Sequence, residues 1–180
     1  MNTFEEVSKS EFYNEDDSGK HKLAFAYFGA AIYHGQCLEA TFQNMLFTDL
    51  IFKKKLKTNK EVNEVIDEIE NSKKSMGKLI IAVKKNYELS EQLTSNLEKI
   101  LDERNYLAHK YFKLNIQKFY SEIGLLEMIK FFCDFTDKAQ LINVELVQHY
   151  ENYRLKLGLS EETIAELMNE IMLEESNRAI

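Results

Sequence analysis

Apolar residues recur every three or four positions along most of the chain, which is the spacing of one face of an α-helix. The first long stretch with this pattern covers about residues 21–52, and the second covers about residues 121–157. Gly158 is placed to end the second stretch, and Ser160 is placed to cap a final short helix. The shorter patterns cover residues 61–70, residues 74–87, the segment from a cap at Ser90 or Thr94 to a break near Asn115, and residues 161–173.

Residues that interrupt helices are scarce in this chain. Proline is absent, and glycine occurs six times in 180 residues. A β-sandwich or a β-barrel would need more turn residues than this, so the composition favours long helices. We therefore predict an all-α bundle of five to seven helices, with two long helices at its centre.

The length and composition are those of one folded domain. With 44% hydrophobic residues, the chain can bury a core of ordinary size. Residues 1–18 are polar and acidic, and we expect them to form a loose leader before a single helical domain over residues 19–180. This leader has no apolar centre typical of a signal peptide.

The apolar segments and the cysteines indicate a protein that works away from membranes. The longest nearly uninterrupted apolar run, residues 23–33, is about half the length of a membrane span. Cys37 and Cys133 show no paired spacing, and we interpret them as buried free thiols of a reducing compartment. We expect a soluble, cytoplasmic protein with no membrane partner.

The net charge of −7 is unevenly distributed. Residues 1–17 carry six acidic residues and one lysine, and residues 160–180 carry six acidic residues and one arginine. The body between them carries 21 basic and 18 acidic residues, which is a charge of +3. This mildly basic body is compatible with an RNA substrate but does not require one.

One charged residue interrupts the apolar stripe of the helix that follows Ser90. On a helical wheel, Arg104 lies near the middle of the stripe that Leu97 and Leu107 belong to. Glu39 interrupts the stripe of the first long helix in the same way. An unpaired cation on an apolar face is costly, so we predict that Glu39 contacts Arg104.

This arginine has a structural and a functional interpretation. In the first, the ion pair fixes helix register and His109 is an incidental neighbour. In the second, Arg104 supplies a permanent cation for a phosphate, and His109 exchanges a proton with a ribose hydroxyl or a leaving oxygen. Asn105, one turn before His109, holds the imidazole or contacts substrate. We find no metal-ligand motif such as HExxH or CxxC and predict no metal or cofactor.

The segment RNYLAH, from Arg104 to His109, resembles the Arg-x4-6-His signature of HEPN-domain proteins. The continuation through Lys110 to Tyr111 resembles the Arg-x4-His-x-Tyr form found in HEPN toxins that are paired with nucleotidyltransferase antitoxins. The resemblance implies a helical fold, metal-independent cleavage of RNA and a homodimer in which two motifs form one composite site. It also implies that the apolar stripe around Arg104 lies beside the dimer seam.

The resemblance gives each matching residue a role. Arg104 would bind the scissile phosphate, His109 would be the general acid and base, and Asn105 would support the site. Tyr111 corresponds to the tyrosine that the antitoxin adenylylates, and is our candidate modification site. Glu39 comes from the stripe argument instead, as the group that orients Arg104.

Three functions remain open from the sequence. The leading hypothesis is a metal-independent HEPN-type endoribonuclease, a toxin or a component of phage defence. The alternative is a non-catalytic HEPN-like module that binds a protein partner or a nucleotide. The third is a helical interaction protein in which the pair of Glu39 and Arg104 is purely structural.

Overall fold

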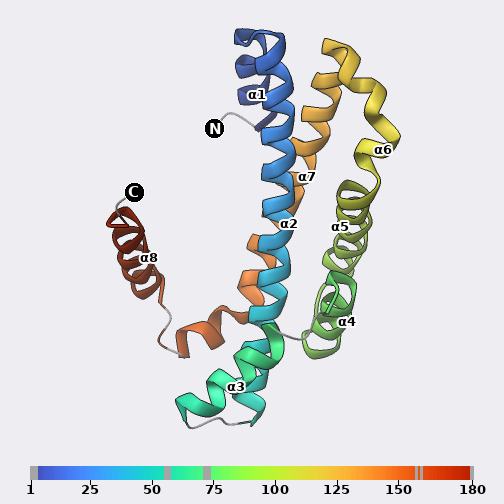
Figure 1. Cartoon of the computed structure of the whole chain (residues 1–180). Helices are drawn as coiled ribbons and strands as arrows, with labels where there is room; N and C mark the ends of the chain where they lie inside the picture. The colour runs from blue at the N-terminus through green and yellow to red at the C-terminus, as the bar shows by residue number, and fades with distance from the viewer. Residues whose placement is uncertain (1–3, 55–57, 71–73, 157, 159, 179–180) are drawn as a thin grey trace.

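In a computed structural model of the protein, which describes residues 4–54, 58–70, 74–156, 158 and 160–178, every regular element is helical. Figure 1 shows the helices arranged around two long central ones. The elements are α1 (Phe4–Asn14), α2 (Asp17–Lys54), α3 (Asn59–Glu70), α4 (Met76–Asn86), α5 (Glu91–His109), α6 (Tyr111–Asn115), the 3-10 helix η1 (Ile116–Tyr120), α7 (Glu122–Lys156) and α8 (Glu161–Ser176). The all-α prediction with two long core helices is therefore confirmed.

The two long helices, α2 and α7, run side by side in the same direction (Figure 1). Contacts between them advance together along both chains, from Lys20 with Glu122 to Thr41 with Asn143. Helices α4 and α5 pack on α2, and α5 also contacts α7, so a three-sided core forms between them. Its largest fully buried side chains include Phe42, Phe132, Phe135, Leu38, Leu97 and Ile100.

Polar caps and one glycine set several helix ends. Ser90 caps α5, because its hydroxyl accepts a hydrogen bond from the Leu93 amide at 3.0 Å. Ser160 caps α8 in the same way through the Thr163 amide, at 3.1 Å. Gly158 lies between α7 and α8 with φ of +77°, a left-handed conformation that glycine adopts without strain.

The acidic leader contributes a helix to the bundle, which corrects the expectation that it is loose. Phe12 of α1 is fully buried, and Ser8 is buried beside Cys133 of α7, with 3.8 Å between Oγ and Sγ. The hydroxyl of Tyr27 on α2 donates to Glu11 at 2.7 Å. One well-placed aromatic residue thus holds a segment whose average composition is polar.

The described part of the chain contains eight α-helices, one more than the maximum of seven that we predicted. Helix α1 comes from the leader, and α6 is a single short helix where we expected a break. Both cysteines are free thiols, Cys133 buried and Cys37 half-buried. In the described part of the chain, no helix combines the length and apolarity that crossing a membrane requires.

His21 ties the start of α2 to η1. Its Nδ1 lies 2.7 Å from the carbonyl oxygen of Asp17, and its Nε2 lies 3.0 Å from the carbonyl oxygen of Phe119. Both partners are acceptors, so both nitrogens donate only when the imidazole carries two protons. These two hydrogen bonds raise the pKa of His21 above its ordinary value, beside the charged groups of Asp17, Lys20 and Glu122.

We expect His21 to stabilise the fold more at low pH than at high pH. Because its pKa is raised on folding, its contribution is complete below the unfolded pKa of about 6.5 and is lost as the pH rises through the folded pKa. Thermal unfolding of the wild type and His21→Ala should show a larger difference in Tm at pH 6 than at pH 8. A difference in Tm that is equal at both pH values would contradict the charged clamp, and His149→Ala serves as the control.

Candidate active site at the end of α5

The last two turns of α5 carry the residues of the RNYLAH motif. The apolar face of this helix is firmly docked, because Leu93, Leu97, Ile100 and Leu107 are all buried. The helix ends at His109, since Lys110 leaves the helical conformation with φ of −129° and ψ of −23°. The motif therefore lies on a rigid element that stops just beyond His109.

Arg104 and Glu39 form the predicted contact. The Nη2 of Arg104 donates to the Oε1 of Glu39 at 2.5 Å, which confirms the pairing inferred from the two interrupted stripes. The side chains are 27% and 25% exposed, so the pair lies at the edge of the core and not inside it. Gly35, one turn before Glu39, faces the aliphatic part of the arginine, since a Cβ added there would lie 3.6 Å from the Cγ of Arg104.

The guanidinium group of Arg104 keeps some of its hydrogen-bonding capacity. An arginine carries five N–H donors. In the described part of the chain, Nη2 uses one toward Glu39 and Nη1 uses one toward the side-chain oxygen of Asn105, at 3.3 Å. None of its nitrogens is buried without a partner. Its Nε has no hydrogen-bond partner among these residues and is not buried, so this donor is open to solvent and can reach an anion.

His109 is exposed on the neighbouring flank of α5. It lines a shallow hollow of about 630 Å³ together with Asp102, Asn105, Tyr106 and Lys110. Arg104 is not part of the lining, because the two motif residues are about 140° apart on the helical wheel. Asn105 connects them, since it contacts the arginine and lies one turn before the histidine.

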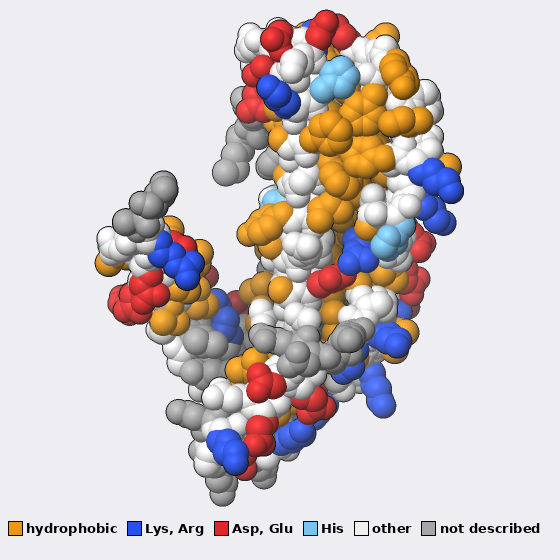
Figure 2. Space-filling view, in the orientation of Figure 1, with side chains coloured by type: hydrophobic (Ala, Val, Ile, Leu, Met, Phe, Trp, Pro, Cys, Tyr) orange, Lys and Arg blue, Asp and Glu red, His pale blue; other side chains and the backbone are white. Residues whose placement is uncertain are grey.

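The structure thus brings Glu39, Arg104 and Asn105 together and puts His109 beside them. Figure 2 shows acidic, basic and histidine side chains next to one another where α2 meets α5. A ligand that contacts both Arg104 and His109 must pass over Asn105. This arrangement can bind an anion at the guanidinium and exchange a proton at the imidazole a few ångströms further along the same ligand.

Tyr111 lies below this surface. It is 3% exposed, and its hydroxyl is buried with no hydrogen-bond partner among the described residues. The rings of Phe131 and Phe132 lie 4.8 and 4.9 Å from its ring, and burial raises the pKa of the hydroxyl. Modification of Tyr111 stays a prediction, and it requires α6 to move so that the hydroxyl becomes accessible.

An aromatic surface next to the site was only partly visible in the sequence. Phe25 and Phe28 belong to the apolar stretch that forms α2, and their aromatic partners include residues of α6 and η1. Phe25 is 55% exposed, and its ring lies 5.8 Å from Phe112 and 5.3 Å from Phe119. Figure 2 shows the resulting apolar patch over the upper part of α2 and the adjoining α6–η1 segment. We call these four phenylalanines the aromatic patch.

Two further observations bear on the site. Within the described residues, no group of three or more His, Cys, Asp or Glu side chains is arranged to hold a metal ion. Comparisons with protein-family models, curated proteins and solved structures found no match to this chain. Any assignment of function therefore depends on the motif and on the geometry described above.

We expect the pair of Glu39 and Arg104 to stabilise the fold measurably. A double-mutant cycle with Glu39→Gln and Arg104→Gln, followed by urea unfolding, should give a coupling energy of about 1–2 kcal/mol, because the hydrogen bond is charged and three-quarters shielded from water. The more exposed pair of Lys84 on α4 and Glu98 on α5, at 2.9 Å, is the matched control and should give less than about 0.5 kcal/mol. Equal coupling energies in the two cycles would show that the inner pair is merely incidental.

Proposed function

We propose that the protein is a cytoplasmic, metal-independent endoribonuclease of the HEPN type, acting as a toxin or in phage defence. The observation that carries this proposal is the position of Arg104, which Glu39 and Asn105 hold on one side, on a partly exposed surface next to the exposed His109. Cleavage of a phosphodiester by proton transfer needs a cation that stabilises the charge on the phosphate and a group that exchanges a proton, and Arg104 and His109 can supply them.

The proposed reaction uses the ribose 2′-hydroxyl as the nucleophile. A base takes the proton of this hydroxyl, its oxygen forms a bond to phosphorus, and the bond from phosphorus to the 5′ oxygen breaks. The departing oxygen takes a proton from an acid, and the first product ends in a 2′,3′-cyclic phosphate. In this scheme His109 supplies proton transfer, and Arg104 stabilises the charge that builds on the phosphate oxygens.

A second copy would complete this chemistry. One chain offers one His109 in a hollow open to solvent, whereas the reaction needs a base and an acid on opposite sides of the phosphate. The aromatic patch next to the motif is the kind of apolar surface that a subunit interface covers. Both observations favour a homodimer in which the two motifs face each other, with RNA in the space between them.

The alternative is a non-catalytic module that binds a protein partner or a nucleotide. The observation in its favour is the negative charge around the motif. Glu39 already neutralises part of the charge of Arg104, and Asp102 lines the hollow that contains His109. Both carboxylates would repel a phosphate at short range. A nucleotidyltransferase antitoxin remains a possible partner of the leading hypothesis, through Tyr111.

Cleavage of RNA in EDTA is the direct test. We expect purified wild-type protein to cut RNA, and His109→Ala and Arg104→Ala to lose at least about 100-fold in rate, because each removes a group acting on the transition state. His149→Ala and Arg178→Ala remove the same residue types elsewhere on the chain and should keep the wild-type rate.

The variants should also be checked by circular dichroism. If the wild type cuts neither bulk RNA nor tRNA, the nuclease proposal fails and the binding module is favoured. If Arg104→Ala does not fold, Arg104→Lys keeps the charge at the helix seam. A folded lysine variant with full activity would contradict a specific role for the guanidinium in binding phosphate.

The dimer proposal predicts that a charge in the aromatic patch separates the subunits. Phe25→Asp should separate the subunits that meet at this patch, which light scattering reports as a smaller assembly, and should lower the cleavage rate, because a carboxylate cannot be buried there without a partner. Phe25 is already 55% exposed in the single chain, so the variant should still fold. Tyr13→Asp alters an aromatic residue of α1 that is 68% exposed and should leave the dimer intact. A wild-type monomer at all concentrations would overturn this prediction.

A further inference from the structure

Helix α8 presents an apolar face that none of the residues described by the structure covers. Leu167, Met168, Ile171 and Met172 recur at helical spacing and are 46%, 57%, 59% and 58% exposed. The helix contains no buried residue, and Figure 1 shows it standing apart from the bundle. An isolated helix of 16 residues is only marginally stable in water, so this face is suited to a docking partner.

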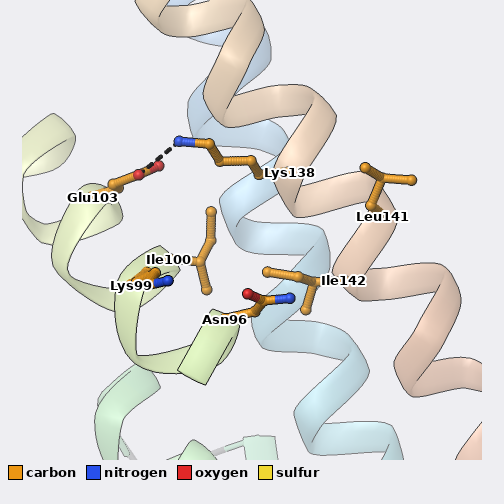
Figure 3. A pocket seen from close by; sticks show the side chains of 7 residues that line it. All are labelled: Asn96, Lys99, Ile100, Glu103, Lys138, Leu141 and Ile142. Carbon is orange, nitrogen blue, oxygen red and sulfur yellow. Dashed lines mark hydrogen bonds and ion pairs between the residues drawn. The ribbon is translucent and has the colours of Figure 1, made fainter. Parts of the chain in front are cut away.

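A groove between α5 and α7 has the dimensions and chemistry to accept such a helix face. It encloses about 290 Å³, and Figure 3 shows Ile100 of α5 and Ile142 of α7 directed into the space between the two helices. Leu141, on the α7 rim, is 71% exposed, and Val144 on the same helix is 61% exposed. The groove is also lined by Asn96, Lys99, Glu103 and Lys138.

The charges of the helix and the groove are complementary. The segment of residues 160–178 carries six glutamates and one arginine, and all six glutamates are exposed. The groove carries Lys99 and Lys138 against the single carboxylate of Glu103, which Lys138 contacts at 2.7 Å. On the helical wheel, Glu170 and Glu174 lie along one edge of the apolar stripe, so an apolar stripe with an acidic edge meets an apolar floor with lysines on its rim.

Folded straight back along α7, the α8 of the same chain would bring its apolar stripe short of this groove. Helix α7 ends at Lys156, and at 1.5 Å per residue Leu141 lies about 22 Å back along it. Folded back against α7 from Ser160, Met168 would reach only about 12 Å, roughly one half of that distance. The residues at the level of the groove would then be Glu174 and Glu175, which do not suit an apolar floor.

We propose that α8 of one copy docks in the α5–α7 groove of a second copy of this chain. Leu167, Met168 and Ile171 pack on the apolar floor, and the glutamates along one edge of the stripe, Glu170 and Glu174, face the lysines on the rim of the groove. Because each copy has one helix and one groove, the exchange is reciprocal and closes around a two-fold axis.

This interface is separate from the proposed nuclease site and does not depend on it. On the α5 wheel, Glu103 of the groove lies about 100° to one side of Arg104, and Asn105 lies about 100° to the other side. The groove thus opens away from the flank that carries Asn105 and His109. A protein without ribonuclease activity would exchange its helices equally well.

Cysteine cross-linking between two distinguishable copies tests the exchange. Leu141→Cys is made in one copy and Ile171→Cys in a second copy lengthened by a tag, both with Cys37→Ser so that only the buried Cys133 remains as a native thiol. After mixing and mild oxidation, we expect a covalent heterodimer on a non-reducing gel. Leu173→Cys, on the opposite face of α8 and 63% exposed, is the matched control and should give at least about five-fold less heterodimer.

The possible results separate the proposal from its competitors. Absence of the heterodimer in folded protein overturns it. A homodimer from Ile171→Cys alone, as abundant as the heterodimer, means that α8 pairs with α8 and also overturns it. A double variant with both cysteines in one chain that closes only within the monomer would show that α8 reaches its own groove. Lys99→Glu with Lys138→Glu should lower the yield of heterodimer, because like charges would then face one another.

Discussion

The parallel packing of α2 against α7 is the constraint on which the other helices depend. Contacts between the two advance in register from Lys20 with Glu122 to Phe52 with Tyr153, so neither helix can slide without breaking all of them. Two parallel helices need a long connection, and α3 to η1 provide it. Within this connection α5 returns antiparallel along the α2–α7 seam, which brings the end of α5 to the middle of α2. The position of Arg104 next to Glu39 follows from that geometry.

The ion pair at this seam has two effects that act in opposite directions. Glu39 fixes the guanidinium, so Arg104 loses little conformational freedom when an anion arrives, and ordering costs are reduced. The same carboxylate also lowers the net charge available to the anion. Because the pair is about a quarter exposed, water screens part of this repulsion, while the short hydrogen bond still sets the orientation. An arginine with spare donors and a fixed direction is more useful to a site than a free cation on a mobile side chain.

The features that could be predicted from the sequence depend on neighbouring residues or on a charged residue in an otherwise apolar stripe. Helix ends could be predicted at Ser90, Gly158 and Ser160 because capping depends on neighbouring residues. The contact of Glu39 with Arg104 could be predicted because each charge interrupts an apolar stripe. The contribution of Phe12 was missed, since one buried aromatic residue does not change the average of an acidic segment. The bond of His21 to Phe119 spans 98 residues, and the groove joins α5 to α7, so neither follows from local spacing. The roles of Arg104 and His109 in catalysis are still predictions.

The uneven charge of the chain gains a physical interpretation from the two exposed apolar surfaces. The segment of residues 160–180, with a charge of −5, is tethered to a body of +3, and it would compete with any anionic ligand of that body if it were free to approach the basic side chains. If α8 docks beside Lys99 and Lys138, its glutamates would neutralise the charge of these lysines on one flank of α5. The other flank, with His109 and Lys110, would stay clear of the acidic helix. In such an assembly the acidic end would act as a structural element, and it would not compete with a substrate for Arg104 and Lys110.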